Sequence, residues 1–516
     1  MGGFEPVSSV RGAVSLEFVR RAWIPWPEGG FGEIRGSEGE RRPGHGVGSA
    51  AGAGSGRVMK PAIETDVAVV GGGGAGLMAA ATAATVGDGL DVLLLERDAG
   101  EPCNSLISSS FIPAAGSRLQ RAAGIEDSAE EMAADILRKN GRRSDPEVTL
   151  ELCRRSAETI HWFIDGLGVD LEFAPEVAWI GHSHPRMHSH PTRSGMPVIE
   201  RMRERLVSLG NATVLDETTG TGLIRDAGGA VTGVTARRHG AELRIAARRV
   251  VLATGGFNAN REMLARYIPE MADAPNIGAR SSRGDGIGWG MAIGAAVDHM
   301  SGYQGRDCIF DDGTRLTPGV INEGGIAVNA TGRRFVGEDR DYSELAAVYR
   351  AQPGGFAVFV WDARIQRMTE NMHVMREAMR KGGIAKCDRV VGIAERFGLP
   401  AGTLAETIDG YNTGVRSGSD AYARKNLTEP LAPPFLAARV TGAMAHTQGG
   451  LRVDTACRVL RPDGRPVPNL HAGGNTMAGL SGDSAGGYTS GNGLLVAYAS
   501  GMIIGRHAVA SIKGER

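Results

Sequence analysis

Three glycines, Gly71, Gly73 and Gly76, follow the apolar run 67–70 and precede an alanine-rich segment. Their spacing matches G-x-G-x-x-G, in which the backbone turns tightly and approaches a pyrophosphate that a Cβ atom would obstruct. A helix over about residues 75–86 would direct free amides and its positive dipole end at the phosphates. We therefore interpret this segment as a dinucleotide-binding turn.

The next predicted strand, 91–95, ends at Glu96, twenty residues beyond Gly76. An acid at this distance binds a pair of ribose hydroxyls and argues against NADP, whose 2′-phosphate it would repel. Strand, glycines, helix, strand and acid occur in the expected order, which is more specific than glycines alone. FAD and NAD both remain open at this point.

The elements that must position this turn predict an α/β fold. A meander over 212–252 runs into a buried strand that ends in glycines, and apolar strand character returns near 468–474. Between them, 301–445 mixes short strands with charged helices. We expect a Rossmann-like nucleotide-binding domain, discontinuous in sequence over 61–300 and 446–516, with an inserted α+β cap domain at 301–445.

The composition excludes several classes of protein. The 516 residues include 57 Lys plus Arg and 58 Asp plus Glu, which gives no electrostatic reason to expect nucleic acid or an anionic membrane as partner. The five cysteines are scattered, with no C-x-x-C pair, which favours a reduced, cytoplasmic setting. Two uncharged runs, 67–87 and 484–505, are rich in glycine, serine and threonine, and indicate buried elements rather than integral membrane segments.

The first 60 residues are rich in glycine, arginine and proline without periodicity, and we expect disorder there. Arg20-Arg21 is not followed by the apolar segment that an export signal requires. Met59 is our hypothesis for the natural start, and mass spectrometry of the native N-terminus tests it.

Four of the twelve histidines lie within 181–190, which raises the question of a metal site. No cysteine or carboxylate is close by in sequence, and Pro185 and Pro191 favour an extended segment. We therefore predict no metal centre. A hydroxyl- and amide-rich loop at 102–110 is a separate candidate for contacts to a phosphate, ribitol or ring edge.

With these motifs in place, the chain resembles the fumarate reductase and succinate dehydrogenase flavoprotein family, including its soluble branch with 3-ketosteroid dehydrogenases. The likeness covers about residues 62–510. It is carried by the glycine turn with Glu96, the Asn104-Ser105 loop, Ala253-Thr254-Gly255-Gly256-Phe257, Gly284-Asp285-Gly286, Arg334-Phe335-Val336-x-Glu338, His446-Thr447-Gln448-Gly449-Gly450 and Ala472-Gly473-Gly474.

The resemblance implies non-covalent FAD, with a cap domain closing over its isoalloxazine ring. Asp285 could cap the helix that it precedes or hold a cofactor hydroxyl. A helix opening near Asn492 would stabilise the negative charge that reduced FAD gains. The residues implied to bind FAD are Gly71, Gly73, Gly74, Ala75, Gly76, Glu96, Arg97, Asn104, Ser105, Ser109, Ala253, Thr254, Gly255, Asp285, His446, Gly474, Asn475, Asn492, Gly493, Leu494 and Leu495.

The substrate positions depart from those of fumarate reductases. Tyr342 stands where that family has the proton-donating arginine, and Tyr488 replaces an arginine that clamps a carboxylate. The aligned histidine and glutamate of the dicarboxylate site become Arg306 and Pro318. Without those bidentate clamps we do not expect fumarate as substrate.

The run 487–491, Gly-Tyr-x-Ser-Gly, is similar to that of the branch that introduces a 4,5 double bond into saturated 3-ketosteroids. The resemblance implies a small cyclic ketone or enone as substrate, with Tyr488 as the base and Ser490 as its hydrogen-bonding partner. Tyr342 would orient the carbonyl or exchange protons, and amides of Gly491 or Gly493 could bind the carbonyl oxygen. A tyrosine with its ordinary pKa of about 10 needs help at neutral pH, and Arg306 is the expected source.

Two alternatives stay open. An enoate or enone reductase of the fumarate type would run the chemistry in reverse, with reduced FAD as the electron donor. In a flavin-binding protein without activity, no ketone would reduce the bound FAD. The sequence does not identify the electron acceptor.

Overall fold

The computed structural model describes residues 63–175 and 179–515; the predicted disordered extension and Met59 lie outside the described residues. The central sheet is built around β1 (Ile63–Val70), which pairs in parallel with β2 (Val92–Leu95) and β9 (Ala241–Leu252). Parallel strands β6 (Ala212–Leu215) and β18 (Pro466–Ala472) extend it on either side. All four residues of β2 are buried, as expected for a strand covered on both faces.

The predicted meander is present beside this sheet. Strands β7 (Thr218–Arg225) and β8 (Val231–Arg238) pair antiparallel with each other, and β8 pairs antiparallel with β9. Strand β17 (Arg458–Leu460) pairs antiparallel with β18 at the opposite edge. Residues from both sequence halves therefore share one sheet, which confirms the predicted α/β fold with a discontinuous nucleotide-binding part.

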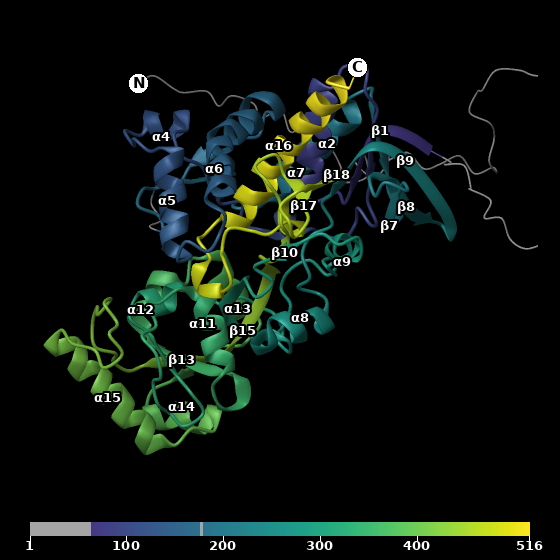
Figure 1. Ribbon diagram of the computed structural model, residues 1–516. Coiled ribbons are helices and arrows are strands. Elements are labelled where there is room, and N and C mark those ends of the chain that lie inside the picture. The colour runs from purple at the N-terminus through teal and green to yellow at the C-terminus, as the bar shows by residue number, and fades with distance from the viewer. Residues whose placement is uncertain (1–62, 176–178, 516) are drawn as a thin grey trace, which may run out of the picture.

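Two helices, α2 (Gly74–Val86) and α16 (Asn492–Lys513), pack along each other (Figure 1). Glycine makes this approach possible, since a Cβ at Gly501 would lie 2.6 Å from the Ala75 carbonyl oxygen. By length and composition α16 is the one described helix that could cross a membrane, but 78% of its apolar window is buried inside the protein. Its apolar character is accounted for by core packing.

Further helices, short strands and turns make up the rest of the described chain outside 301–445. They are α3 (Asn104–Ile107), β3 (Ile112–Pro113), α4 (Arg118–Ala122), α5 (Ala129–Lys139), α6 (Pro146–His161), the π-helix η1 (Trp162–Gly166), β4 (Glu172–Phe173), β5 (Met187–Ser189), α7 (Met196–Ser208), α8 (Arg261–Tyr267), α9 (Asp285–Ala292), β10 (Val297–Asp298), β16 (Gly450–Leu451) and the 3₁₀ turns η2 (Pro269–Met271), η4 (Gly474–Thr476) and η5 (Ala485–Gly487).

A second sheet forms the lower lobe in Figure 1, in the order β11-β15-β13-β12 with β14 paired to β15. Strand β15 is long enough to reach from this lobe back to the nucleotide-binding part. The elements are β11 (Tyr303–Ile309), α10 (Gly319–Asn322), β12 (Ile326–Val328), α11 (Tyr342–Arg350), η3 (Pro353–Gly355), β13 (Ala357–Asp362), α12 (Ala363–Thr369), α13 (His373–Arg380), β14 (Ala385–Cys387), α14 (Val390–Phe397), α15 (Ala401–Ser417) and β15 (Phe435–Thr447).

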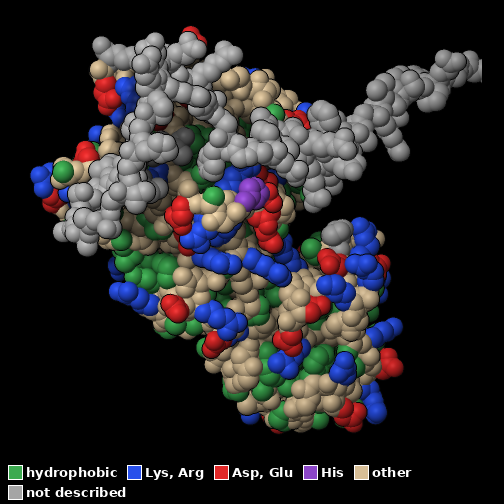
Figure 2. Space-filling model, turned by 90° about the vertical axis from the view of Figure 1, so that its right-hand side faces the viewer, with side chains coloured by type: hydrophobic (Ala, Val, Ile, Leu, Met, Phe, Trp, Pro, Cys, Tyr) green, Lys and Arg blue, Asp and Glu red, His purple; other side chains and the backbone are tan. Residues whose placement is uncertain are grey.

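The two larger sheets have separate apolar cores. One core gathers buried side chains from 67–252 and 451–512, whereas the other draws only on 308–440. We keep the division into a nucleotide-binding domain and a cap domain as a proposal. Acidic and basic side chains are mixed across the face in Figure 2, as the balanced composition leads one to expect.

Candidate active site

A cavity extends from the glycine turn after β1 to the N-terminus of α16, and β11 and α11 of the second sheet's lobe also line it. Segments far apart in the chain therefore meet at one site. The predicted cofactor-binding residues that line it are Gly71, Gly73, Gly74, Ala75, Glu96, Arg97, Asn104, Ser105, Ser109, Ala253, Thr254, Gly255, Asp285, His446, Gly474, Asn475, Gly493 and Leu494.

Three predicted residues do not reach the cavity wall. Gly76 is required by helix packing instead, because a Cβ there would lie 1.8 Å from the Gly71 carbonyl oxygen. Asn492 and Leu495, on α16, are buried and do not line the cavity. The spacing of the motifs places the right backbone at the cavity, but the phase of the helix decides which side chains face it.

The glycine turn leaves space for a ligand. Gly71 has φ +106°, a conformation that favours glycine. A Cβ on Gly73 would have only the Cys103 Cβ atom nearby, at 3.7 Å, so this position is open on the cavity side. The Gly72 amide donates to Glu96 Oε2, and the Asp98 amide donates to Glu96 Oε1 at 3.0 Å. The acid at the end of β2 is thereby fixed against the turn.

Of the two compatible roles expected of Asp285, capping of α9 is wrong, whereas contact with a cofactor hydroxyl stays a prediction. Gly284, with φ +82°, is the N-cap, and no side chain caps this helix. The carboxylate of Asp285 instead pairs with Arg97, whose Nη1 lies 3.3 Å from Oδ2. Arg97 also donates from Nη2 to the Ser281 carbonyl oxygen at 2.5 Å, so the pair links β2's end to α9 at the cavity wall.

The four predicted catalytic residues, Tyr342, Ser490, Arg306 and Tyr488, all line the cavity. Tyr342 Oη lies 3.2 Å from Ser490 Oγ. The Arg306 guanidinium lies over the Tyr342 ring, 4.7 Å from its centre. Gln304 Nε2 donates to Tyr342 Oη at 3.3 Å. Among the described residues, Ser490 is therefore the partner of Tyr342 and not of Tyr488, contrary to the sequence expectation.

Tyr488 has different surroundings. The Gly493 amide, which the sequence interpretation had offered to the substrate carbonyl, lies near its hydroxyl and opposes the rise of its pKa. Its ring packs edge-on against Tyr342 at 6.5 Å and against His446 at 5.7 Å between ring centres. Burial lowers the pKa of His446 to about 4, so this ring is neutral at physiological pH.

The two tyrosines differ in how easily they lose a proton. Burial raises the pKa of Tyr342, but the Arg306 cation and hydrogen bonds from Ser490 and Gln304 oppose that rise. Burial raises the pKa of Tyr488 well above its ordinary value, and proximity to Tyr342 adds to the increase. The pKa of Tyr342 is therefore raised less than that of Tyr488, and Tyr342 loses its proton more readily.

Gln304 and Arg315 are among the polar residues of the wall that sequence reasoning missed. Gln304 lies on β11 two residues before Arg306, which was a detectable signal. Arg315 is brought back beside β11 by a tight turn, in which the Phe310 amide donates to the Thr314 carbonyl oxygen. The Asp-Asp-Gly sequence at 311–313 is a turn signal that could have indicated this return.

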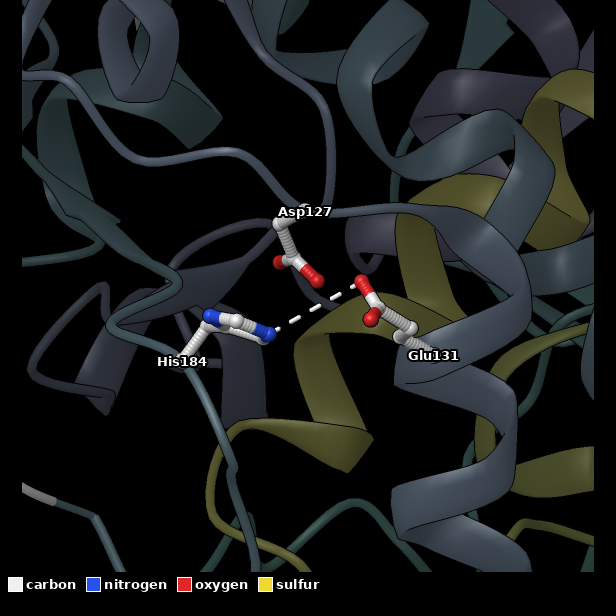
Figure 3. Close-up of side chains that lie close together, drawn as sticks. All are labelled: Asp127, Glu131 and His184. Atoms are coloured by element: carbon white, nitrogen blue, oxygen red, sulfur yellow. Dashed lines mark ion pairs between the residues drawn. The ribbon is translucent and has the colours of Figure 1, made fainter.

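The histidine segment does not form one cluster. His184 lies 3.7 Å from Glu131 and close to Asp127, as Figure 3 shows, so carboxylates distant in sequence do approach it. Asp127, however, is already held by Arg186, with Nε–Oδ2 2.7 Å and Nη2–Oδ1 2.9 Å. The other histidines have separate partners, and His182 Nε2, for example, lies 2.9 Å from the Ser490 carbonyl oxygen. The absence of a metal centre stays a prediction.

Comparison with known proteins decides the family. The model of the FAD binding domain family matches residues 66–494, most of the chain. The chain belongs to this family of FAD-binding flavoproteins. A probable fumarate reductase of Shewanella frigidimarina is 29% identical over 427 residues, which are 82% of this chain and 71% of that protein.

Two solved structures share the family fold. The open conformation of a flavocytochrome c3 fumarate reductase has a TM-score of 0.76 and 28% identity, covering 87% of this chain and 79% of that one. A 3-ketosteroid Δ4-(5α)-dehydrogenase from Rhodococcus jostii, in complex with 4-androstene-3,17-dione, has a TM-score of 0.72 and 27% identity, covering 88% and 98%. These likenesses confirm the resemblance drawn from the motifs.

This FAD-binding flavoprotein is an FAD-dependent oxidoreductase, and its cavity fits the cofactor. Gly73 leaves room at the turn, and the first amides of α2 line the wall beside it. The buried Ser110 Oγ, on the same wall, has no hydrogen-bond partner among the described residues. A polar ligand in the cavity would satisfy such groups.

Proposed function

We propose that this flavoprotein is a dehydrogenase that introduces a C=C bond next to the carbonyl of a cyclic ketone, most like a 3-ketosteroid 4-dehydrogenase. The observation that carries the proposal is the assembly of Tyr342, Ser490 and Arg306 at one wall of the cavity. Tyrosines replace the arginines that a dicarboxylate would need, and a cation lies over one of them. This arrangement suits removal of a proton α to a carbonyl.

In the proposed reaction a tyrosine oxygen takes the α proton, and the C–H electrons move toward the carbonyl. Tyr342 is the base that the contacts favour, with Ser490 positioned to pass the proton on. Tyr488, which keeps its proton, would donate to the carbonyl oxygen and stabilise the developing enolate. Bound FAD supplies the acceptor for the β hydride and its electron pair.

Anaerobic reduction of the bound FAD tests this proposal. The holoenzyme is mixed with saturated steroid ketones, small cyclohexanones and dicarboxylates, and bleaching of the FAD absorbance is followed. We expect bleaching by one of the ketone classes and none by succinate. Bleaching by succinate, or by nothing in the panel, would contradict the proposal, and the second result would support a flavin-binding protein without this activity.

The likeness to fumarate reductases supports a second candidate, an enoate or enone reductase that uses reduced FAD. Reoxidation of photoreduced holoenzyme by a cyclic enone or by fumarate, under anaerobic conditions, distinguishes the two directions. If the protein is a reductase, its substrate should reoxidise the reduced enzyme faster than the ketone reduces the oxidised enzyme.

The five cysteines are all free thiols. We include a reduced, cytoplasmic setting in the proposal.

A buried ion pair offers a test of how the base is positioned. Lys139 Nζ on α5 lies 2.9 Å from Asp341 Oδ2, and Asp341 caps α11 directly before Tyr342. We expect Lys139→Met to lower kcat/KM on the cyclic ketone by about tenfold, because the start of α11 loses its fixed place.

Lys139→Arg keeps the charge and should restore most of the rate, while FAD absorbance is unchanged in both variants. If Lys139→Met turns over at the rate of the unaltered enzyme, the pair has no part in positioning Tyr342.

A further inference from the structure

Two arginines enter the cavity wall from the cap side, Arg306 on β11 and Arg315 on the chain that returns beside it. Among the described residues, neither side chain forms a hydrogen bond or an ion pair with an acid. The acids of the wall, Glu96, Glu101 and Asp285, all come from the nucleotide-binding segments. The cap contributes two cations to the cavity and no carboxylate.

Holding two unpaired cations together is unfavourable. Burial and the nearby Arg306 cation lower the pKa of Arg315, and Glu377 only partly opposes them, yet a guanidinium stays protonated in proteins. Half-buried charges of like sign are normally compensated by an anion. Arg306 is partly compensated by its contact with the Tyr342 ring. Arg315 forms no ion pair or ring contact among the described residues; the one carboxylate that acts on its charge is Glu377, which pairs with Lys381 instead.

The cofactor phosphates are not a sufficient explanation for these cations. The glycine turn and the N-terminus of α2 already provide a phosphate site on other elements. The wall also carries aromatic side chains, with Phe111 and Trp179 in contact at 5.1 Å between ring centres. A ligand with an apolar ring and one anionic group would match the aromatic side chains and the two arginines of this wall.

We propose that the substrate is a cyclic keto acid whose carboxylate is bound by Arg315 and Arg306. This proposal rests on the proposed function for the ketone part and adds the carboxylate as a recognition group. It differs from a fumarate site because the positions of the fumarate-type clamps hold Tyr342 and Tyr488. Arg315 would act in binding, and its loss should raise KM far more than it lowers kcat.

A binding experiment tests the anion site without turnover. Calorimetric titration of the holoenzyme with cyclohexanecarboxylate and with cyclohexanecarboxamide compares two ring compounds that differ in charge. We expect the carboxylate to bind, and Arg315→Gln to weaken its binding by roughly 30-fold or more, the loss typical of breaking one desolvated charge pair. Arg380→Gln is the matched control, because Arg380 is exposed on α13 and outside the cavity.

Retained FAD absorbance shows that Arg315→Gln is folded, and Arg315→Lys should bind with intermediate affinity because it keeps charge but loses the planar fork. Equal binding of carboxylate and carboxamide, or equal affinity in Arg315→Gln and the unaltered protein, would overturn the proposal.

A turnover experiment separates this proposal from the proposed function. FAD bleaching is compared for 4-oxocyclohexanecarboxylate and its methyl ester. Faster bleaching by the acid supports both proposals. Equal bleaching by both compounds keeps the ketone dehydrogenase and overturns the keto acid. No bleaching by either, with carboxylate binding that depends on Arg315, overturns the dehydrogenase and retains the anion site alone.

Discussion

Replacing Tyr342 with Phe is expected to slow FAD reduction by a cyclic ketone by about 10²- to 10⁴-fold, the usual contribution of a general base. The hydroxyl that contacts Ser490 and Gln304 is lost, while the ring beneath Arg306 remains. FAD content should not change. Tyr349→Phe is a matched control, because its buried hydroxyl on the same helix has no hydrogen-bond partner among the described residues and lies outside the cavity.

The pH profile sharpens this test. The pKa of Tyr342 is raised, so at neutral pH the tyrosine is protonated and the basic form increases about tenfold per pH unit. The reduction rate should therefore rise with pH between 7 and 9 in the unaltered enzyme and lose that rise in Tyr342→Phe. Tyr488→Phe should also cut turnover but keep the rise. The opposite pattern would assign the base to Tyr488, as the sequence first indicated.

Replacing Gly73 with Val is expected to weaken FAD binding by about 100-fold or more, equal to about 2.7 kcal/mol, without unfolding the protein. Gly73 has φ −79°, which any residue adopts, and its Cβ direction is open on the cavity side. The added side chain would occupy space that the phosphates need. FAD affinity of the apoprotein, measured by calorimetry, and its thermal unfolding check the two parts of this prediction.

Gly76→Ala provides the contrast. Its Cβ would lie 1.8 Å from the Gly71 carbonyl oxygen, so helix α2 could not stay in place and the apoprotein itself should be destabilised. Gly402→Val, at an open position of α15, should leave both FAD affinity and thermal unfolding nearly unchanged. If Gly73→Val binds FAD as the unaltered protein does, the turn does not approach the phosphates closely.

Local signals predicted the fold well because the relevant interactions are local. The buried run 67–70, the glycine turn and the alanine-rich helix each follow from neighbouring residues, and α2 begins within one residue of the expected position. Turn signals likewise placed the meander between β7 and β9. The C-terminal contribution to the same sheet could be predicted because apolar strand character recurs in the sequence at β18, which pairs with β9.

The chemistry of the site was harder to predict because it depends on contacts between distant segments. Ser490 was assigned to Tyr488, two residues away, whereas α11 brings Tyr342 to it from 148 positions earlier. Arg315 reaches the wall only because a turn folds it back beside β11. Whether Asn492 faces the cavity depends on the rotation of α16, which a motif does not specify.

The N-terminus of α16 also has an electrochemical consequence. Gly491, Gly493 and Leu494 line the cavity, so the positive end of a helix of 22 residues is directed at it. Together with the Arg306 and Arg315 cations, it favours the more negatively charged, reduced state of a redox group bound there. The midpoint potential of this flavoprotein should accordingly lie above that of free FAD. Such an enzyme takes electrons from a saturated substrate readily and passes them only to an acceptor of higher potential.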